Sequence, residues 1–204
     1  MPKIVDHDAR RRDFIAAAYE TIMEKGLAKA TVRAVAKRAG YTTGALVHYF
    51  GDKDELIREA LDYFGNDVRA RMQHAHRAQV GRAALRDTVV ESLPTDKRSG
   101  SSWRVWLALW YHSESSDEMR REERRRYREW IGRLSQMLEE SKELGELPAS
   151  IDARAEARSL AALVDGIGVQ YLMSGGTMRP QKMIAAVERY LARLYRDGID
   201  RDRR

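Results

Sequence analysis

The sequence predicts an all-α protein, and three observations support this prediction. Gly and Pro are few, at 14 and 4 of the 204 residues, whereas the helix-favouring Ala, Arg, Glu and Leu are abundant. Apolar residues recur along much of the chain at helical spacing. No segment shows a convincing alternation of apolar and polar residues, which would indicate a β-strand. We therefore expect about nine helices and no sheet.

The first expected helix extends from residue 7 or 8 to residue 25, because apolar side chains recur there every three or four residues. Gly26 ends it, and Thr31 then caps a short second helix. Gly40 ends the second helix, since glycine adopts the positive φ that closes a helix. Thr42 or Thr43 caps a third helix over 43–49. A turn this short holds two helices at a steep angle, which is the geometry of a helix-turn-helix.

The rest of the chain predicts longer helices. Asp52 caps a helix that continues towards Gln79, so that a rigid helix joins the first part to the second. We place a first domain at 1–53 and a second domain at 54–204. The stretch PTDKRSGSS, residues 94–102, is the clearest loop, and the polar end DGIDRDRR is expected to fray. Further helices are expected over 82–93, 103–112, 117–144, 152–173 and 180–195.

The charge of the chain is concentrated near its beginning. Residues 1–53 contain ten Lys/Arg and six Asp/Glu, so this quarter holds +4 of the net charge of +6. The remaining residues are near balance. A locally basic segment indicates a polyanionic partner for that part of the chain, although a basic surface without a partner is an equal alternative on charge alone.

Several classes of protein are disfavoured by composition. With no Cys there is no disulfide framework and no thiolate metal site, which suits the cytoplasm. The N-terminus lacks a secretory pattern, and the most apolar helix is interrupted by Asp165 and Gln170 and too short to span a membrane. The five His show no metal-ligand spacing, and no catalytic or cofactor-binding motif is present. We therefore expect no metal, no cofactor, no catalytic residues and no enzymatic activity.

The segment TVRAVAKRAGYTTGALVHYFGDKDEL, residues 31–56, resembles the DNA-binding signature of the TetR family of bacterial regulators. The resemblance covers residues 8–65, and WLALWYHS and ALVDGI further along are similar to the Bet-type branch of the family. Tyr41 and His48 depart from the pattern, which usually has an aliphatic and an aromatic residue there. The matching positions are Thr31, Val32, Val35, Ala36, Ala39, Gly40, Thr42, Gly44, Leu46, Tyr49, Phe50, Lys53 and Leu56.

The resemblance implies that double-stranded operator DNA is the partner of this segment. It assigns Tyr49 and Lys53 to phosphate contacts, and the helix N-terminus at Thr31 also suits a phosphate. The outer side of the 43–49 helix reaches base edges, and Arg33 can reach a guanine or a phosphate. Three arginines at 10–12 are expected to add phosphate contacts. The predicted DNA-binding residues are Thr31, Arg33, Thr42, Thr43, Gly44, Ala45, His48, Tyr49 and Lys53.

An aromatic cluster in the second half predicts a site for a small effector. Three Trp recur at i, i+3 and i+7, so they share one helix face, and an acidic residue stands in a mostly apolar helix further on. Such a set suits a hydrophobic or cationic ligand, because aromatic faces attract cations. The alternative is a packed core. The predicted ligand-binding residues are Trp103, Trp106, Trp110, Tyr127, Asp165 and Tyr171.

The last two expected helices predict a dimer interface. The segment 159–176 is rich in small residues that permit close helix contact, namely Ala161, Ala162, Gly166 and Gly168. Two copies of this helix pair form a four-helix bundle, unless the same face packs within the chain. The charged run RREERRRYREW, residues 120–130, is instead expected to be a solvated helix, because Glu is interleaved with Arg.

Together these features predict a homodimeric transcriptional repressor that binds a pseudo-palindromic operator and is released by a small-molecule effector. Two alternatives remain at this point. One is an architectural DNA-binding protein without an effector, and the other is a helical enzyme or carrier that has reused the fold.

Overall fold

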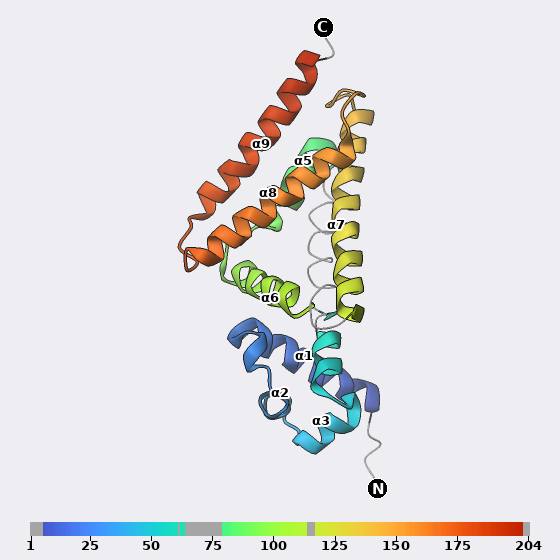
Figure 1. Cartoon of the computed structure of the whole chain (residues 1–204), viewed down its shortest axis with the longest axis vertical. Helices are drawn as coiled ribbons and strands as arrows, with labels where there is room; N and C mark the ends of the chain where they lie inside the picture. The colour runs from blue at the N-terminus through green and yellow to red at the C-terminus, as the bar shows by residue number, and fades with distance from the viewer. Residues whose placement is uncertain (1–5, 61, 64–78, 114–116, 202–204) are drawn as a thin grey trace. The chain divides into compact units, whose positions relative to one another are not determined.

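The computed structural model describes residues 6–60, 62–63, 79–113 and 117–201. Within these residues every regular element is a helix and none is a strand, which confirms the predicted all-α class (Figure 1). The chain divides into two compact units, Met1–Arg69 and Ala70–Arg204. None of the described helices combines the length and the apolar character that a membrane span requires.

The first unit is a small helical cluster built around a mostly apolar core. Its helices are α1 (His7–Lys25), the short 3₁₀ helix η1 (Leu27–Lys29), α2 (Val32–Ala39), α3 (Thr43–Phe50) and a further helix over 53–60. The predicted helix bounds agree with these to within about one residue. The helix that begins after Asp52 was expected to continue towards Gln79, but residues 61 and 64–78 lie outside the described part. The core side chains are Phe14, Ala17, Ala18, Ile22, Val35, Ala36, Leu46, Phe50, Leu56, Ile57 and Ala60.

Local hydrogen bonds set the turn between α2 and α3. Gly40 has φ 76°, and its N–H donates to the carbonyl of Lys37 while the N–H of Tyr41 donates to that of Ala36. This pair of bonds is the Schellman arrangement, which requires a residue with positive φ and therefore favours glycine. Thr42 then begins α3, because its Oγ1 accepts from the N–H of Ala45 at 3.1 Å. The predicted helix-turn-helix is confirmed.

The second unit is a larger bundle of α5 (Gly81–Glu91), α6 (Lys97–Ser113), α7 (Asp117–Glu143), α8 (Ala153–Met173) and α9 (Pro180–Arg201). The helix α7 packs against α5, α6 and α8, and α9 packs against α5 and α8 (Figure 1). The core that they enclose is mainly aliphatic, with Leu85, Leu93, Leu134, Leu138 and Leu160 fully buried. Asp152 caps α8, accepting from two backbone N–H groups at 3.0 Å.

The structure corrects the predicted loop over 94–102, because α6 begins at Lys97. Asp96 and Ser99 form a reciprocal capping box, in which each side chain accepts from the backbone N–H of the other at 2.7 and 3.0 Å. Gly100 is buried, and a Cβ there would lie 2.5 Å from the hydroxyl oxygen of Tyr171 on α8. Packing against α8 therefore offsets the low helix propensity of this Ser/Gly-rich stretch.

The predicted end of α9 at residue 195 also needs correction, because the helix continues to Arg201. Leu194 and Tyr195 are buried in the core of the second unit. The Tyr195 hydroxyl lies 2.7 Å from Oγ of Ser141 on α7, and the Arg82 guanidinium lies over its ring. These contacts hold α9 to the bundle near residue 195, where the sequence predicted its end.

Candidate DNA interface and effector site

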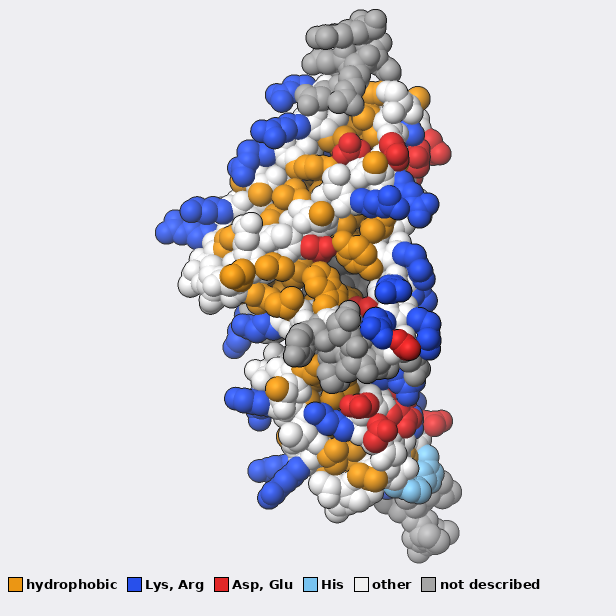
Figure 2. Space-filling model, in the orientation of Figure 1, with side chains coloured by type: hydrophobic (Ala, Val, Ile, Leu, Met, Phe, Trp, Pro, Cys, Tyr) orange, Lys and Arg blue, Asp and Glu red, His pale blue; other side chains and the backbone are white. Residues whose placement is uncertain are grey.

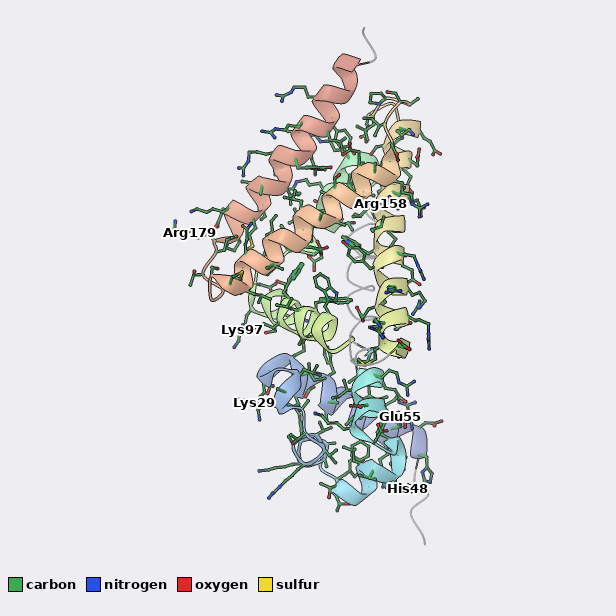
Figure 3. The ribbon with its side chains drawn as sticks, viewed as in Figure 1. Lys29, His48, Glu55, Lys97, Arg158 and Arg179 are labelled. Carbon is green, nitrogen blue, oxygen red and sulfur yellow. The ribbon has the colours of Figure 1, made fainter. Side chains whose placement is uncertain are left out.

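The helix α3 presents one buried side and one exposed side. Leu46 and Phe50 are fully buried, which fixes the rotation of the helix on the core. Because an α-helix turns every 3.6 residues, the opposite side carries Thr43, Gly44, Val47 and His48, all exposed. Figure 3 labels His48 on this outer side. An exposed face on the second helix of a helix-turn-helix is the surface that enters a major groove.

The other predicted DNA-binding residues lie on α2, on α3 and at the start of the helix over 53–60. Thr31, Arg33, Thr42 and Lys53 are exposed, whereas Ala45 and Tyr49 are partly buried. The hydroxyl oxygens of Thr31 and Thr42 accept from backbone N–H groups as helix caps, at 3.2 and 3.1 Å. Each hydroxyl proton remains able to donate to a phosphate oxygen. These exposed residues therefore offer groups that suit DNA backbone contacts.

The site prediction left out two residues, one on the exposed side of α3 and one beside Tyr49. Val47 is exposed on α3, and its position four residues after Thr43 was the available signal. His7, at the start of α1, lies with its Nδ1 2.8 Å from the hydroxyl of Tyr49. No sequence signal links these two side chains, which are separated by 42 residues. The contact fixes the position of the Tyr49 hydroxyl at the surface.

Arg11 was predicted to contact phosphates, but its guanidinium is bound to other groups of the first unit. Its guanidinium donates to the carboxylates of Glu55 and Glu59 and, at 2.6 Å, to the carbonyl oxygen of Tyr49. It also lies over the ring of Phe50. The hydrogen bonds and charge of the two carboxylates raise its pKa, mainly through Glu59. Arg11 thus ties α1 to the end of α3 and to the helix that follows.

Tyr41, where the family pattern usually has an aliphatic residue, extends the core of the first unit to its surface. Its ring centroid lies 5.0 Å from that of Phe14, and the guanidinium of Arg10 lies over its outer face. The hydroxyl donates to the carboxylate of Asp13 at 3.0 Å. A tyrosine is accommodated because one end of the side chain packs on apolar atoms while the other remains hydrogen-bonded.

Trp103 and Tyr171, two of the predicted ligand-binding residues, pack within the bundle. Trp103 is 7% exposed, and its Nε1–H donates to the carbonyl oxygen of Ser92 at 2.9 Å. Its ring contacts α8 at Gly168, where a Cβ would overlap it. Tyr171 lies against the backbone of α6 at Gly100. This geometry favours the packed-core alternative for both, whereas Trp106 and Trp110 are only partly buried on α6.

The structure brings Tyr127 of α7 and Asp165 of α8 together. The tyrosine hydroxyl donates to a carboxylate oxygen of Asp165 at 2.7 Å, although the residues are 38 apart in sequence. Burial raises the pKa of Asp165, and the hydrogen bond from Tyr127 partly opposes this. Burial and the neighbouring carboxylate raise the pKa of Tyr127 to about 12. A partly buried carboxylate with a raised pKa is a candidate ligand-binding group.

Tyr127 is 37% exposed, so the pair is accessible from solvent. Figure 2 shows hydrophobic side chains gathered over α6 and α8. Among the described residues, no group of three or more His, Cys, Asp or Glu side chains is arranged to hold a metal ion.

The charged run on α7 is internally paired, in agreement with its interpretation as a solvated helix. Arg125 bonds to Glu122 and Glu129, and Arg126 bonds to Glu122 and Glu123, over spacings of three and four residues.

The small residues of α8 divide into two sets. Ala161 and Gly168 are buried in the chain's own core, which corrects their prediction as interface residues, whereas Ala162 is exposed.

A helix-turn-helix with an exposed second helix, followed by a separate helical bundle, defines a DNA-binding regulator with a second functional unit. Residues 14–60 match the family model of bacterial regulatory proteins of the tetR family. Residues 81–196 match that of the C-terminal region of BetI-type transcriptional repressors. The chain therefore belongs to the TetR family of bacterial transcriptional regulators and has a BetI-type C-terminal region.

Curated relatives match this chain over most of their length. The chain is 32% identical over 207 residues to the HTH-type transcriptional regulator BetI 2 of Chromohalobacter salexigens, with 98% of this chain and 92% of that protein covered. It is 34% identical over 178 residues to BetI of Paraburkholderia xenovorans, with 86% and 88% covered. These families and relatives are transcriptional regulators and not enzymes, which confirms the predicted class.

Solved structures share the fold. A transcriptional regulator from a Rhodococcus species has a TM-score of 0.79 at 26% identity, with 92% of this chain and 97% of that chain covered. A regulator from Saccharomonospora viridis, solved in complex with choline, has a TM-score of 0.83 at 22% identity, with 91% and 96% covered. The second likeness concerns the fold alone.

Proposed function

We propose that this regulator is a homodimeric repressor that binds a pseudo-palindromic operator through α3 and is released by a small cationic effector with apolar substituents. Residues 1–53 bind the DNA, and residues 54–204 bind the effector and the second subunit. The observation that supports the effector most directly is the partly buried Tyr127–Asp165 pair, with its raised carboxylate pKa. The dimer and the operator symmetry rest on the exposed faces of α8 and α3.

The surface around α3 supports DNA binding by its composition. Thr43 and His48 present polar groups to base edges, while Lys53 presents a charge to the DNA backbone. Binding is tested with duplexes recovered by selection from a random library with the full chain. Lys53→Ala should weaken binding to all sequences similarly and reduce the salt dependence, because it removes a phosphate contact. Lys29→Ala is the matched control, since Lys29 is exposed on η1 away from His48 in Figure 3.

The outer side of α8 supports dimerisation through the last two helices. Ala155, Ser159 and Ala162 are exposed, and a Cβ added at Gly166 would meet no atom within 4 Å in its own chain. Small side chains at this spacing leave one side of α8 without projecting side chains, so another helix can approach it closely. A twofold-symmetric dimer presents two copies of α3 to two half-sites, so the operator should have matching symmetry.

Gly166→Trp tests this interface. The large side chain should prevent close approach of the second subunit and give monomers that bind DNA poorly, as measured by analytical ultracentrifugation and gel shift. Gly132→Trp on α7 is the control, because a Cβ at Gly132 also meets no atom within 4 Å but lies outside the proposed interface. A wild-type chain that sediments only as a monomer at micromolar concentration would exclude the dimer.

The Tyr127–Asp165 pair supports a cationic effector on electrostatic grounds. Burial removes water from the Asp165 carboxylate and disfavours its charged form. A bound cation stabilises the charged form in place of the lost water, so the site favours a cation over a neutral ligand. The adjacent tyrosine ring adds attraction of about 0.5–2 kcal/mol if the cation lies over its face. The choline found in the Saccharomonospora viridis regulator is a ligand of this class. An effector that binds better to the conformation unable to bind DNA shifts the population towards that conformation.

The effector is tested by titrating choline and its uncharged isostere, in which a tert-butyl group replaces the trimethylammonium. Choline should bind more tightly than the isostere and lower operator affinity by about 5–150-fold, the range of a 1–3 kcal/mol coupling. Asp165→Asn should abolish the preference for the cation. Glu156→Gln is the matched control, because Glu156 is also on α8 and also accepts from a tyrosine, Tyr190, at 2.6 Å. Equal binding of both compounds to the wild type would refute the cation site.

A further inference from the structure

Val47 is an exposed aliphatic side chain on a helix whose other large apolar residues are buried. It is 47% exposed, whereas Leu46 and Phe50 on the same helix are 0% exposed. Tyr63 is the other large hydrophobic residue exposed in the described part of the first unit, and its ring packs against that of Tyr19. Val47 contributes little to the core, so its side chain is available to whatever meets the outer side of α3.

The position of Val47 is central on that side. It follows Thr43 by four residues, which places the two side chains one turn apart on one stripe of the helix. His48 is next to it and also exposed. On a helix of eight residues these are the side chains that project from the middle, between the capped N-terminus and the buried Phe50. They are the ones that meet the floor of a groove into which α3 is inserted.

Valine has two properties that restrict what it can recognise. It offers no hydrogen-bond donor or acceptor, so it cannot distinguish bases by the polar groups on their edges. Its β-branched side chain has one strongly preferred rotamer in a helix, so its two methyl groups are held in place before binding. The apolar group that base edges present in the major groove is the 5-methyl group of thymine. A fixed pair of methyls on α3 therefore matches thymine in shape and polarity.

We propose that Val47 is a specificity-determining residue that contacts the methyl group of one thymine in each operator half-site. The proposal rests on the insertion of α3 into the major groove and adds to it the identity of a base. It predicts that the operator has a required T·A pair at the position that faces the middle of α3, related by twofold symmetry in the other half-site.

The experiment removes the methyl group from the DNA and from the protein separately. The probe is the best duplex recovered by selection with the full-length chain, with deoxyuridine replacing thymine at one symmetric pair of positions at a time. At one such pair, wild-type affinity should fall by about fourfold for each half-site, as expected for one methyl group returned to water, and by about fifteenfold for both. Val47→Ala should bind the unmodified duplex with a similar loss and show no further loss on the deoxyuridine duplex.

Two controls separate this result from a general effect. Val80→Ala removes methyl groups from another exposed valine, in the second unit, and should retain the full deoxyuridine penalty. Val47→Ala should melt at or above the wild-type temperature, because Ala favours helix more than Val does and little buried area is lost. Failure of the wild type to bind any selected duplex would refute the proposed DNA-binding function itself.

Three outcomes would instead overturn the role of Val47 alone. In the first, the wild type binds its selected duplex but no deoxyuridine position costs affinity. In the second, the penalty is the same in Val47→Ala as in the wild type, so that another side chain contacts the methyl. In the third, Val47→Ala weakens binding to all duplexes equally, random sequence included, so that the residue acts through folding or backbone placement.

Discussion

Substituting Ala for Gly168 should destabilise the second unit, although alanine is the better helix former. Gly168 is in the middle of α8, where the ring of Trp103 covers its Cα and a Cβ would overlap three of the ring carbons. The ring has little room to move, since it is 7% exposed and its Nε1–H is bound to the carbonyl of Ser92. The backbone of α8 is held equally firmly, because Val164 and Ile167 are buried in the core.

The magnitude follows from two opposing terms. Overpacking a core by one methyl group costs about 1–3 kcal/mol, and overlap with three ring atoms indicates the upper end of that range. Replacing Gly by Ala within a helix contributes about 1 kcal/mol in the opposite direction. The net loss is therefore about 2 kcal/mol, which for a chain of this length lowers the melting temperature by about 4–8 °C.

Thermal and urea denaturation measure this loss, at one fixed subunit concentration because dimerisation would shift the apparent stability. Gly132→Ala on α7 is the control, since a Cβ there meets no atom within 4 Å and only the gain in helix propensity remains. It should be up to about 1 kcal/mol more stable than the wild type. If Gly168→Ala matched the stability of Gly132→Ala, Trp103 would not be packed on α8, and its assignment to the core would be wrong.

Three further predictions concern single side chains. Burial raises the pKa of Asp165, so the stability that its protonated form contributes is complete below the unfolded-state pKa, near 4, and is lost as the pH rises through the folded-state pKa. Urea titrations should therefore find Asp165→Asn more stable than the wild type at pH 7, with no difference at about pH 4. Thr42→Ala removes the cap of α3 and should cost about 1 kcal/mol of stability, whereas Thr42→Ser, which keeps the cap, should cost only a few tenths; equal losses would refute the capping role. Arg11→Met should cost about 1 kcal/mol, discounted because the guanidinium is one third exposed, and the difference should narrow as salt is added; a loss that is independent of salt would indicate packing rather than charge.

The helix-turn-helix could be predicted from the sequence, and so could part of its exposed side. The turn depends on Gly40 and Thr42, which act on backbone groups within four residues of themselves, so their effect can be read from the sequence. The spacing of Leu46 and Phe50 gives the buried side of α3, whereas Val47 on the opposite side was not predicted and Ala45 is partly buried. Family resemblance over the same segment added the partner, DNA.

Features that depend on residues far apart in the chain could be seen only in the folded protein. The Ser/Gly-rich start of α6 is held by its local capping box and by the fit of Gly100 against Tyr171, and no local signal predicts the second contact. The Tyr127–Asp165 pair and the network around Arg11 join side chains more than 35 residues apart. Their contacts depend on how each helix is rotated and spaced against its neighbours. Rotation and spacing are set by the packing of the whole core, so the sequence pattern of one helix cannot specify them.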